Sequence, residues 1–147
     1  MVESYEYKYI KKIIDLTINN KLNWSEFKNN NIEKSYKSDK YKFNVKELKI
    51  INNNKEIIDT NKQFEFIIRK EYLESNSTYS YILNSIYYKE CFSDNFDIEI
   101  IFDIKSSNEV TMEYKMLNRL FNIVNKHIED KNNALRISNI YAFLDNF

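Results

Sequence analysis

The 147-residue sequence contains neither glycine nor proline. Phosphate-cradling loops, dinucleotide-binding turns and nucleophile elbows all use glycine, because only a residue without Cβ enters left-handed backbone conformations freely and lets a ligand lie against the main chain. The missing glycine therefore argues against these classes of site. Asparagine, whose short amide side chain tolerates the left-handed conformation, is expected to form the turns instead.

Cysteine and histidine occur once each, as Cys91 and His127. A single cysteine excludes an internal disulfide and any cysteine-cluster metal site. Catalysis by Cys91 and His127 would also need orienting groups and an oxyanion hole, which the sequence does not show. We therefore predict no cofactor, no bound metal and no enzymatic activity.

Long apolar runs are also missing. Lysines and Asp15 interrupt residues 5–18, and no segment approaches the roughly 18 consecutive apolar residues that are read as a bilayer-spanning helix. We therefore expect a cytoplasmic protein that does not bind membranes. With 43% hydrophobic residues, the chain has enough apolar side chains to fold around a core.

The formal net charge is zero, with 22 basic and 22 acidic residues, so the chain lacks the overall attraction on which non-specific nucleic-acid binding relies. Lysine, asparagine, isoleucine and tyrosine dominate the composition, and all four have A/T-rich codons. The lysine content is therefore explained by an A/T-rich genome and is not by itself a nucleic-acid signature. The charge is unevenly distributed, because residues 94–113 contain six acids and one lysine.

The N-terminal part predicts a helix over residues 3–18, which ends at Asn19-Asn20. Its buried face is expected to consist of residues at helical spacing: Ile10, Ile13, Ile14, Thr17 and Ile18. The asparagine runs at 29–31, 52–54 and 132–133 predict turns. Residues 28–40 are mostly polar and predict a loop.

From Tyr41 onward the pattern predicts short strands. Apolar segments at 48–51 and 56–58 flank the Asn52–Lys55 turn as in a hairpin, and residues 64–69 alternate. Residues 78–92 fit a helix and a strand equally well; we favour a strand, because turn-like residues bracket the segment and aromatic residues favour pleated surfaces. Residues 96–104 give the clearest strand, with Ile101 as the exception to the alternation.

A long helix is predicted from Ser106 to about Glu129, with Ser106 and Glu109 as a capping box. The apolar stripe of this predicted helix consists of Val110, Tyr114, Leu117, Leu120, Phe121, Val124 and Ile128. Behind Ser138 as a second cap, four more residues have helical spacing and are expected to dock on the domain or form a homodimer: Ile140, Phe143, Leu144 and Phe147.

These elements predict a single α+β domain over residues 1–147. It consists of an N-terminal helix, a mostly antiparallel sheet of about five to six strands over residues 40–104, and a long C-terminal helix packed on one face.

Two groups of residues suggest chemistry other than protein binding. Asp103-Ile104-Lys105 has the acid-x-Lys spacing of metal-dependent nucleases, which need a further carboxylate, and Asp59 is the tidiest candidate. Lysines interleaved with aromatics could track a single nucleic-acid strand. The residues of this alternative are Lys8, Lys11, Lys12, Lys40, Tyr41 and Lys42.

The acidic segment supports the function that we favour, which is a non-enzymatic protein that occupies a surface of another protein. Its candidate partner-binding residues are Asp94, Asp97, Glu99, Asp103, Glu109 and Glu113. Small, neutral proteins of this composition are expected among phage or mobile-element accessory proteins, including inhibitors of bacterial defence nucleases. A nucleic-acid-binding module is the alternative, and a metal-dependent nuclease is the third hypothesis.

Overall fold

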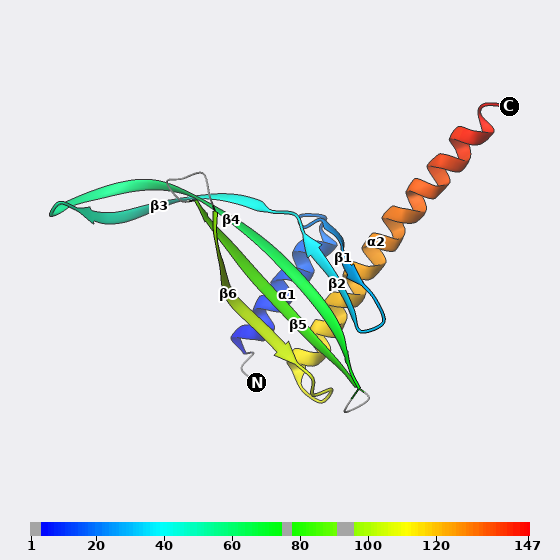
Figure 1. Cartoon of the computed structure of the whole chain (residues 1–147), viewed down its shortest axis with the longest axis horizontal. Coiled ribbons are helices and arrows are strands. Elements are labelled where there is room, and N and C mark those ends of the chain that lie inside the picture. The colour runs from blue at the N-terminus through cyan, green and yellow to red at the C-terminus, as the bar shows by residue number, and fades with distance from the viewer. Residues whose placement is uncertain (1–3, 75–77, 91–95) are drawn as a thin grey trace.

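The computed structural model describes residues 4–74, 78–90 and 96–147 and confirms the predicted α+β fold. A six-stranded antiparallel sheet carries two helices, one from each end of the described chain (Figure 1). The elements in chain order are α1 (Tyr5–Ile18), β1 (Trp24–Asn29), β2 (Glu33–Ser38), β3 (Tyr41–Ile51), β4 (Asn54–Leu73), β5 (Thr78–Glu90), β6 (Phe96–Ser106) and α2 (Met112–Leu144).

Helix α1 forms largely as predicted. The Ser4 side chain caps it by accepting a hydrogen bond from the Tyr7 backbone N–H at 3.1 Å, and the chain leaves the helix through Asn20, whose φ is 58°. Four of the five predicted residues are buried, but Ile18 is 53% exposed and its prediction is wrong. The chain turns back after Asn20, so that Leu22 fills this end of the core instead.

Strand β4 is twenty residues long and organises the sheet. The sheet order is β1-β2-β4-β5-β6, and β3 pairs with the first half of β4 while β2 pairs with residues 67–71 of its second half. Strands β2 and β3 therefore lie end to end along the same edge of β4. At the break between them, the Ser38 hydroxyl accepts a hydrogen bond from the Phe66 backbone N–H at 2.9 Å and continues the ladder.

The prediction of a loop over residues 28–40 is wrong, because most of this segment belongs to the hairpin of β1 and β2. The segment is polar, yet pairing with β4 buries Ser35 and Ser38 and places Tyr36 in the core. The predicted Asn29–Asn31 turn does connect the strands, and the Asn30 side chain accepts hydrogen bonds from the backbone N–H groups of Ile32 and Glu33.

The hairpin of β3 and β4 is confirmed. Asn52 and Asn53 adopt positive φ angles of 50° and 66°, which a two-residue hairpin turn requires and which glycine supplies in most chains. The tip of this hairpin extends beyond the body as a two-stranded ribbon, seen at the left of Figure 1.

The preference for a strand over residues 78–92 is confirmed for the described residues, because β5 pairs with both β4 and β6. The pairing of β5 with β6 shifts register between Ser85 and Ile86. Ser85 pairs with Phe102 and Ile86 pairs with Ile100, so the shift falls at Ile101. This shift interrupts the strict alternation that the sequence predicts across residues 96–104, at the residue that departs from the pattern.

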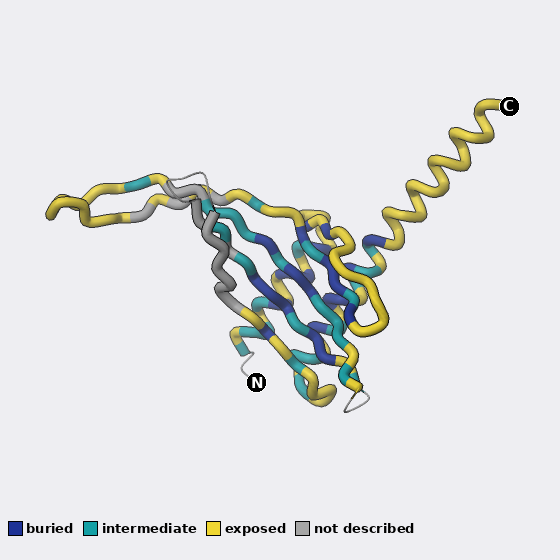
Figure 2. The backbone as a smooth tube through the Cα atoms, in the orientation of Figure 1, coloured by how far each residue is buried: buried dark blue, intermediate teal, exposed yellow. Residues whose placement is uncertain are grey.

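Helix α1 and the first half of α2 cover the same face of the sheet (Figures 1 and 2). The core between them contains residues from α1, from α2 and from the central strands. Its members with the smallest exposure are Ile10, Ile14, Trp24, Ile68, Leu83, Leu117, Leu120 and Val124.

Helix α2 begins later than predicted. Its N-cap is Thr111, whose hydroxyl accepts a hydrogen bond from the Tyr114 N–H at 3.2 Å, while Ser106 is the last residue of β6. The predicted capping box of Ser106 and Glu109 is therefore wrong, because strand pairing with Tyr81 holds Ser106. Val110 precedes the helix and is 81% exposed, so it does not belong to the apolar stripe.

Helix α2 also ends later than predicted. It continues without interruption through Asn132-Asn133 and Ser138 to Leu144, so the predicted turn and second cap are wrong. Two asparagines lower the helix propensity only modestly, and no glycine or proline is present to end the helix. Within the described part of the chain, no helix has the length and apolarity to cross a membrane.

Candidate functional site

The predicted acidic surface is only partly described. Asp94 lies outside the described residues, and so do the side chains of Asp97 and Glu99. Asp103 is exposed and accepts a hydrogen bond from the Asn84 amide at 2.6 Å, on the sheet face that the helices leave uncovered. Exposed Glu109 lies in the connection before α2.

Glu113 lies in the first turn of α2, on the other side of the sheet from Asp103, and accepts a hydrogen bond from the Ser4 hydroxyl at 3.1 Å. The structure therefore places Asp103 and Glu113 on opposite sides of the sheet. A role of the acidic residues in partner binding stays a prediction.

The residues of the nucleic-acid alternative also fall on two sides of the sheet. Lys8, Lys11 and Lys12 lie on the exposed side of α1. The ammonium group of Lys40 lies 4.5 Å from the ring centroid of Tyr88, on the uncovered face. Exposed Lys42 adjoins half-buried Tyr41.

The ring of Tyr41 packs against the core, and its hydroxyl accepts a hydrogen bond from the Asn23 N–H at 2.8 Å. This engaged ring is not free to stack on a base, and the structure does not bring these six residues into one groove.

Asp103 and Lys105 of the acid-x-Lys triplet line a hollow of about 360 Å³ on the uncovered sheet face, while Ile104 packs in the core on the other face. Arg69 lines the same hollow as Asp103 and Lys105, so the neighbouring charges are cationic. Asp59 pairs with Lys46 in the ribbon. Asp103 lies level with Ile67 of β4, because Asn84 of β5 pairs with both residues. Ile67 is eight positions along β4 from Asp59, which is roughly 26 Å at 3.3 Å per residue. The two carboxylates cannot share a metal ion at that separation.

The described residues contain no group of three or more His, Cys, Asp or Glu side chains placed to hold a metal ion. His127 is half-buried on α2, and Cys91 lies outside the described residues.

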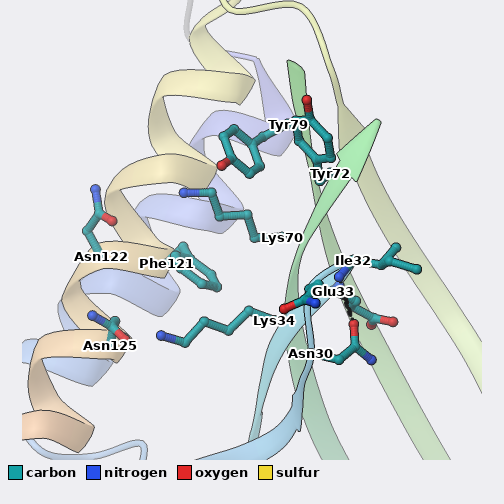
Figure 3. Close-up of a pocket in the computed structure, with 11 residues that line it drawn as sticks. Asn30, Ile32, Glu33, Lys34, Lys70, Tyr72, Tyr79, Phe121, Asn122 and Asn125 are labelled. Carbon is teal, nitrogen blue, oxygen red and sulfur yellow. Dashed lines mark hydrogen bonds between the residues drawn. The ribbon is translucent and has the colours of Figure 1, made fainter. Parts of the chain in front are cut away.

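A pocket that the sequence did not predict lies between the sheet and α2 (Figure 3). Its volume is about 360 Å³, and its walls come from the turn between β1 and β2, from β2, β4 and β5, and from α2. The lining residues are Asn30, Asn31, Ile32, Glu33, Lys34, Lys70, Tyr72, Tyr79, Phe121, Asn122 and Asn125. In this pocket, amides and aromatic rings surround two lysines.

Two lysines of this pocket are direct neighbours. Lys34 of β2 and Lys70 of β4 are cross-strand partners, and both side chains extend toward α2 (Figure 3). The Lys70 ammonium lies 4.4 Å from the ring centroid of Tyr79 and 5.5 Å from that of Phe121. Burial, and secondarily the charge of Lys34, lower the pKa of Lys70.

Acidic side chains near the pocket are engaged elsewhere. Glu33 forms ion pairs with Lys28 at 3.1 Å and Arg69 at 3.4 Å. Among the described residues, neither Lys34 nor Lys70 forms an ion pair with a carboxylate. Glu33 also lines the pocket, but its carboxylate pairs with Lys28 and Arg69 and with neither of these two adjacent cations. Only the fold reveals this pairing, because thirty-six positions separate the two lysines in the sequence.

The far end of α2 forms a second candidate surface. Every residue from Glu129 to Phe147 is exposed, and Figure 2 shows this part of the helix projecting away from the sheet. Its exposed large apolar side chains are Leu135, Ile137, Ile140, Tyr141, Phe143, Leu144 and Phe147. The predicted docking of Ile140, Phe143, Leu144 and Phe147 on the chain's own domain is therefore wrong.

Comparison with known proteins identifies no matching family, no similar curated protein and no similar solved structure. The functional argument therefore depends on the geometry of the two surfaces, the apolar end of α2 and the lysine pocket.

Proposed function

We propose that this protein is a non-enzymatic binding protein that occupies a surface of another protein through the exposed end of α2. The observation that carries the proposal is that every residue from 129 to 147 is exposed, and that seven of these residues have large apolar side chains. Folded proteins seldom leave so much contiguous apolar surface in water unless it serves an interaction.

The apolar side chains of this segment are arranged for docking. Ile137, Ile140, Tyr141 and Leu144 follow the i, i+3, i+4, i+7 spacing with which a helix places anchors into an apolar groove. Their exposed fractions, from 53% for Ile137 to 63% for Tyr141, leave about half or more of each side chain accessible. The partner is accordingly a protein with an apolar groove about as long as two helical turns.

The docking stripe is distinct from the stripe that packs on the sheet. At about 100° per residue, Ile137 lies roughly half a turn around the helix from Ile128, the last buried residue of α2. The stripe therefore faces away from the side of α2 that the chain's own core uses. A partner can cover it without disturbing the core.

Photo-crosslinking of the full chain in cells of its natural host tests this proposal. A photoreactive residue at Ile140 is expected to give a discrete adduct with another protein. The same residue at Asn139, roughly 150° around the helix from the centre of the stripe, is not. Ile140→Asp combined with Leu144→Asp should abolish partner capture while leaving the melting temperature unchanged, because both side chains are exposed.

Three outcomes would contradict the proposal. One is equal crosslinking from positions 139 and 140, and another is no adduct from either. The third is an adduct with twice the mass of the chain, which would show that the stripe of Ile140, Phe143, Leu144 and Phe147 is a homodimer seam.

The proposal also includes a biological setting for this protein, namely a phage or mobile element. A small, neutral accessory protein of a phage or mobile element that inhibits a bacterial defence protein would work in this way, by covering a surface that the target needs. The single cysteine, which cannot form an internal disulfide, agrees with action in the cytoplasm.

A further inference from the structure

The pocket beside α2 shares no residue with the apolar docking stripe and brings two cations together. Lys34 and Lys70 are directly opposite each other on neighbouring antiparallel strands, where like charges destabilise a sheet. Replacing either lysine by a neutral residue would remove this repulsion without exposing the core. An anion bound between the two ammonium groups would offset this repulsion.

We infer that this pocket binds a small organic phosphate, with the phosphate group held between Lys34 and Lys70 and an attached planar ring lying against Tyr72 and Tyr79. Two ammonium groups match a group with two negative charges, and each charge-assisted hydrogen bond to it is stronger than a neutral one. The ligand goes beyond the proposed function and lies on residues separate from the apolar docking stripe.

The aromatic residues support the planar part of the ligand. Tyr72 and Tyr79 are partly exposed, at 36% and 44%, and their ring centroids are 5.4 Å apart with an interplanar angle of 58°. They line one end of the pocket next to Lys70, as Figure 3 shows. A flat ring could cover the exposed face of either tyrosine and gain stacking energy.

The opposite wall supplies hydrogen-bonding groups. Asn122 and Asn125 of α2 line the pocket on the side toward which the two lysines extend (Figure 3). The Asn125 carbonyl oxygen accepts a hydrogen bond from the Tyr36 hydroxyl, and its amide donates to Glu129 at 3.2 Å. These bonds fix Asn125, while exposed Asn122 retains donor capacity for a ligand. The volume of about 360 Å³ lies at the small end of typical ligand sites.

Calorimetric titration of the full chain with adenosine monophosphate tests the inference, with adenosine and inorganic phosphate as the probes that lack one part each. We expect adenosine monophosphate to bind more tightly than either part alone. Lys34→Gln and Lys70→Gln should each weaken binding about tenfold or more, since a hydrogen bond to a charged group contributes about 1.5–3 kcal/mol.

Lys37→Gln is the matched control, because Lys37 is on the same strand as Lys34 but its ammonium lies over Phe27, 5.7 Å from the ring centroid, on the other face. This variant should bind adenosine monophosphate as the unaltered protein does. Circular dichroism of all three variants checks that each is folded. Lys70→Gln removes the like-charge contact with Lys34 and also the contacts of the ammonium with the rings of Tyr79 and Phe121, so its melting temperature is measured alongside its affinity.

The inference is overturned if adenosine monophosphate does not bind at millimolar concentration, or if Lys37→Gln weakens binding as much as Lys70→Gln. Equal affinities for inorganic phosphate and adenosine monophosphate would overturn the assignment of the ring to Tyr72 and Tyr79. None of these results bears on the apolar docking stripe, so the two proposals fail independently.

Discussion

Trp24 of β1 donates a hydrogen bond from its indole nitrogen to the Thr17 hydroxyl of α1 at 3.0 Å. Both residues are 1% exposed, and the Thr17 hydroxyl in turn donates to the Ile13 carbonyl at 2.8 Å. The only polar group of the tryptophan is thereby satisfied inside the core, and the bond fixes the end of α1 against the edge of the sheet.

Replacing Thr17 with valine keeps the shape of the side chain but leaves the indole N–H buried without an acceptor. We expect the free energy of unfolding to fall by about 1–3 kcal/mol, measured by urea denaturation. Thr17→Ser retains the hydroxyl and should lose clearly less. Equal losses for the valine and serine variants would show that the hydrogen bond contributes nothing.

Helix α2 offers a matched pair of leucines. Leu120 is completely buried, so Leu120→Ala should lower the free energy of unfolding by about 2–5 kcal/mol. Leu135 is 60% exposed on the same helix, and Leu135→Ala should change it by no more than about 0.5 kcal/mol. Thermal melts of both variants measure the difference, and similar losses would mean that residues beyond Ile128 pack on the domain.

The start of α2 provides a third test. Thr111→Ala removes the hydroxyl that caps the helix and should cost about 1 kcal/mol in the free energy of unfolding. Glu109→Ala should change stability little, because Glu109 is exposed and lies before the helix. Chemical denaturation of the two variants decides between Thr111 as the N-cap and the capping box of Ser106 and Glu109 that the sequence predicts. A larger loss of stability for Glu109→Ala would support the capping box.

Burial raises the pKa of the Tyr81 hydroxyl to about 12 from its ordinary value of 10.0, with smaller contributions from Tyr114 and Tyr79. Because the pKa is higher in the folded state, the stabilisation by neutral Tyr81 is complete below pH 10 and is lost as the pH rises from 10 to about 12.

The Tyr81→Phe variant has no hydroxyl to ionise at this position. It also loses the hydrogen bond that the Tyr81 hydroxyl donates to Asn118 at 2.7 Å. Its deficit in unfolding free energy relative to the unaltered protein should therefore shrink between pH 9 and pH 11. Parallel pH profiles of the two proteins would contradict the assignment.

The elements that could be predicted from the sequence are those in which one periodicity dominates. The buried residues of α1 at 10, 13, 14 and 17 follow the helical period, and the Asn52-Asn53 turn follows from the conformational tolerance of asparagine. Strand β2 was missed because it is polar along most of its length. Its residues are buried by pairing with β4, thirty or more positions away, and no local pattern reports that contact.

The two ends of α2 show the limits of local capping rules. Ser106 fits an N-cap by sequence, but strand pairing takes precedence over it. The Asn132-Asn133 pair has the composition of a chain turn, yet both residues are helical, because they lie in the middle of an uninterrupted helix. The lysine pocket could not be predicted at all, because it depends on the register that places Lys34 opposite Lys70.

The continuity of β4 has a consequence for the order in which the sheet forms. Strand pairs β1–β2, β3–β4, β4–β5 and β5–β6 join neighbours in the sequence, and only a few residues separate the two strands of each pair. Among the described strand pairs, only that of β2 with β4 must close a long loop, since Glu33 meets Glu71 across the whole of β3 and its turn. Closing such loops is slow, so we expect the ribbon of β3 and β4 to assemble early and the docking of the β1–β2 hairpin to limit the folding rate. Mutations in β2 should then slow folding, whereas mutations at the ribbon tip should leave the rate of that last step unchanged.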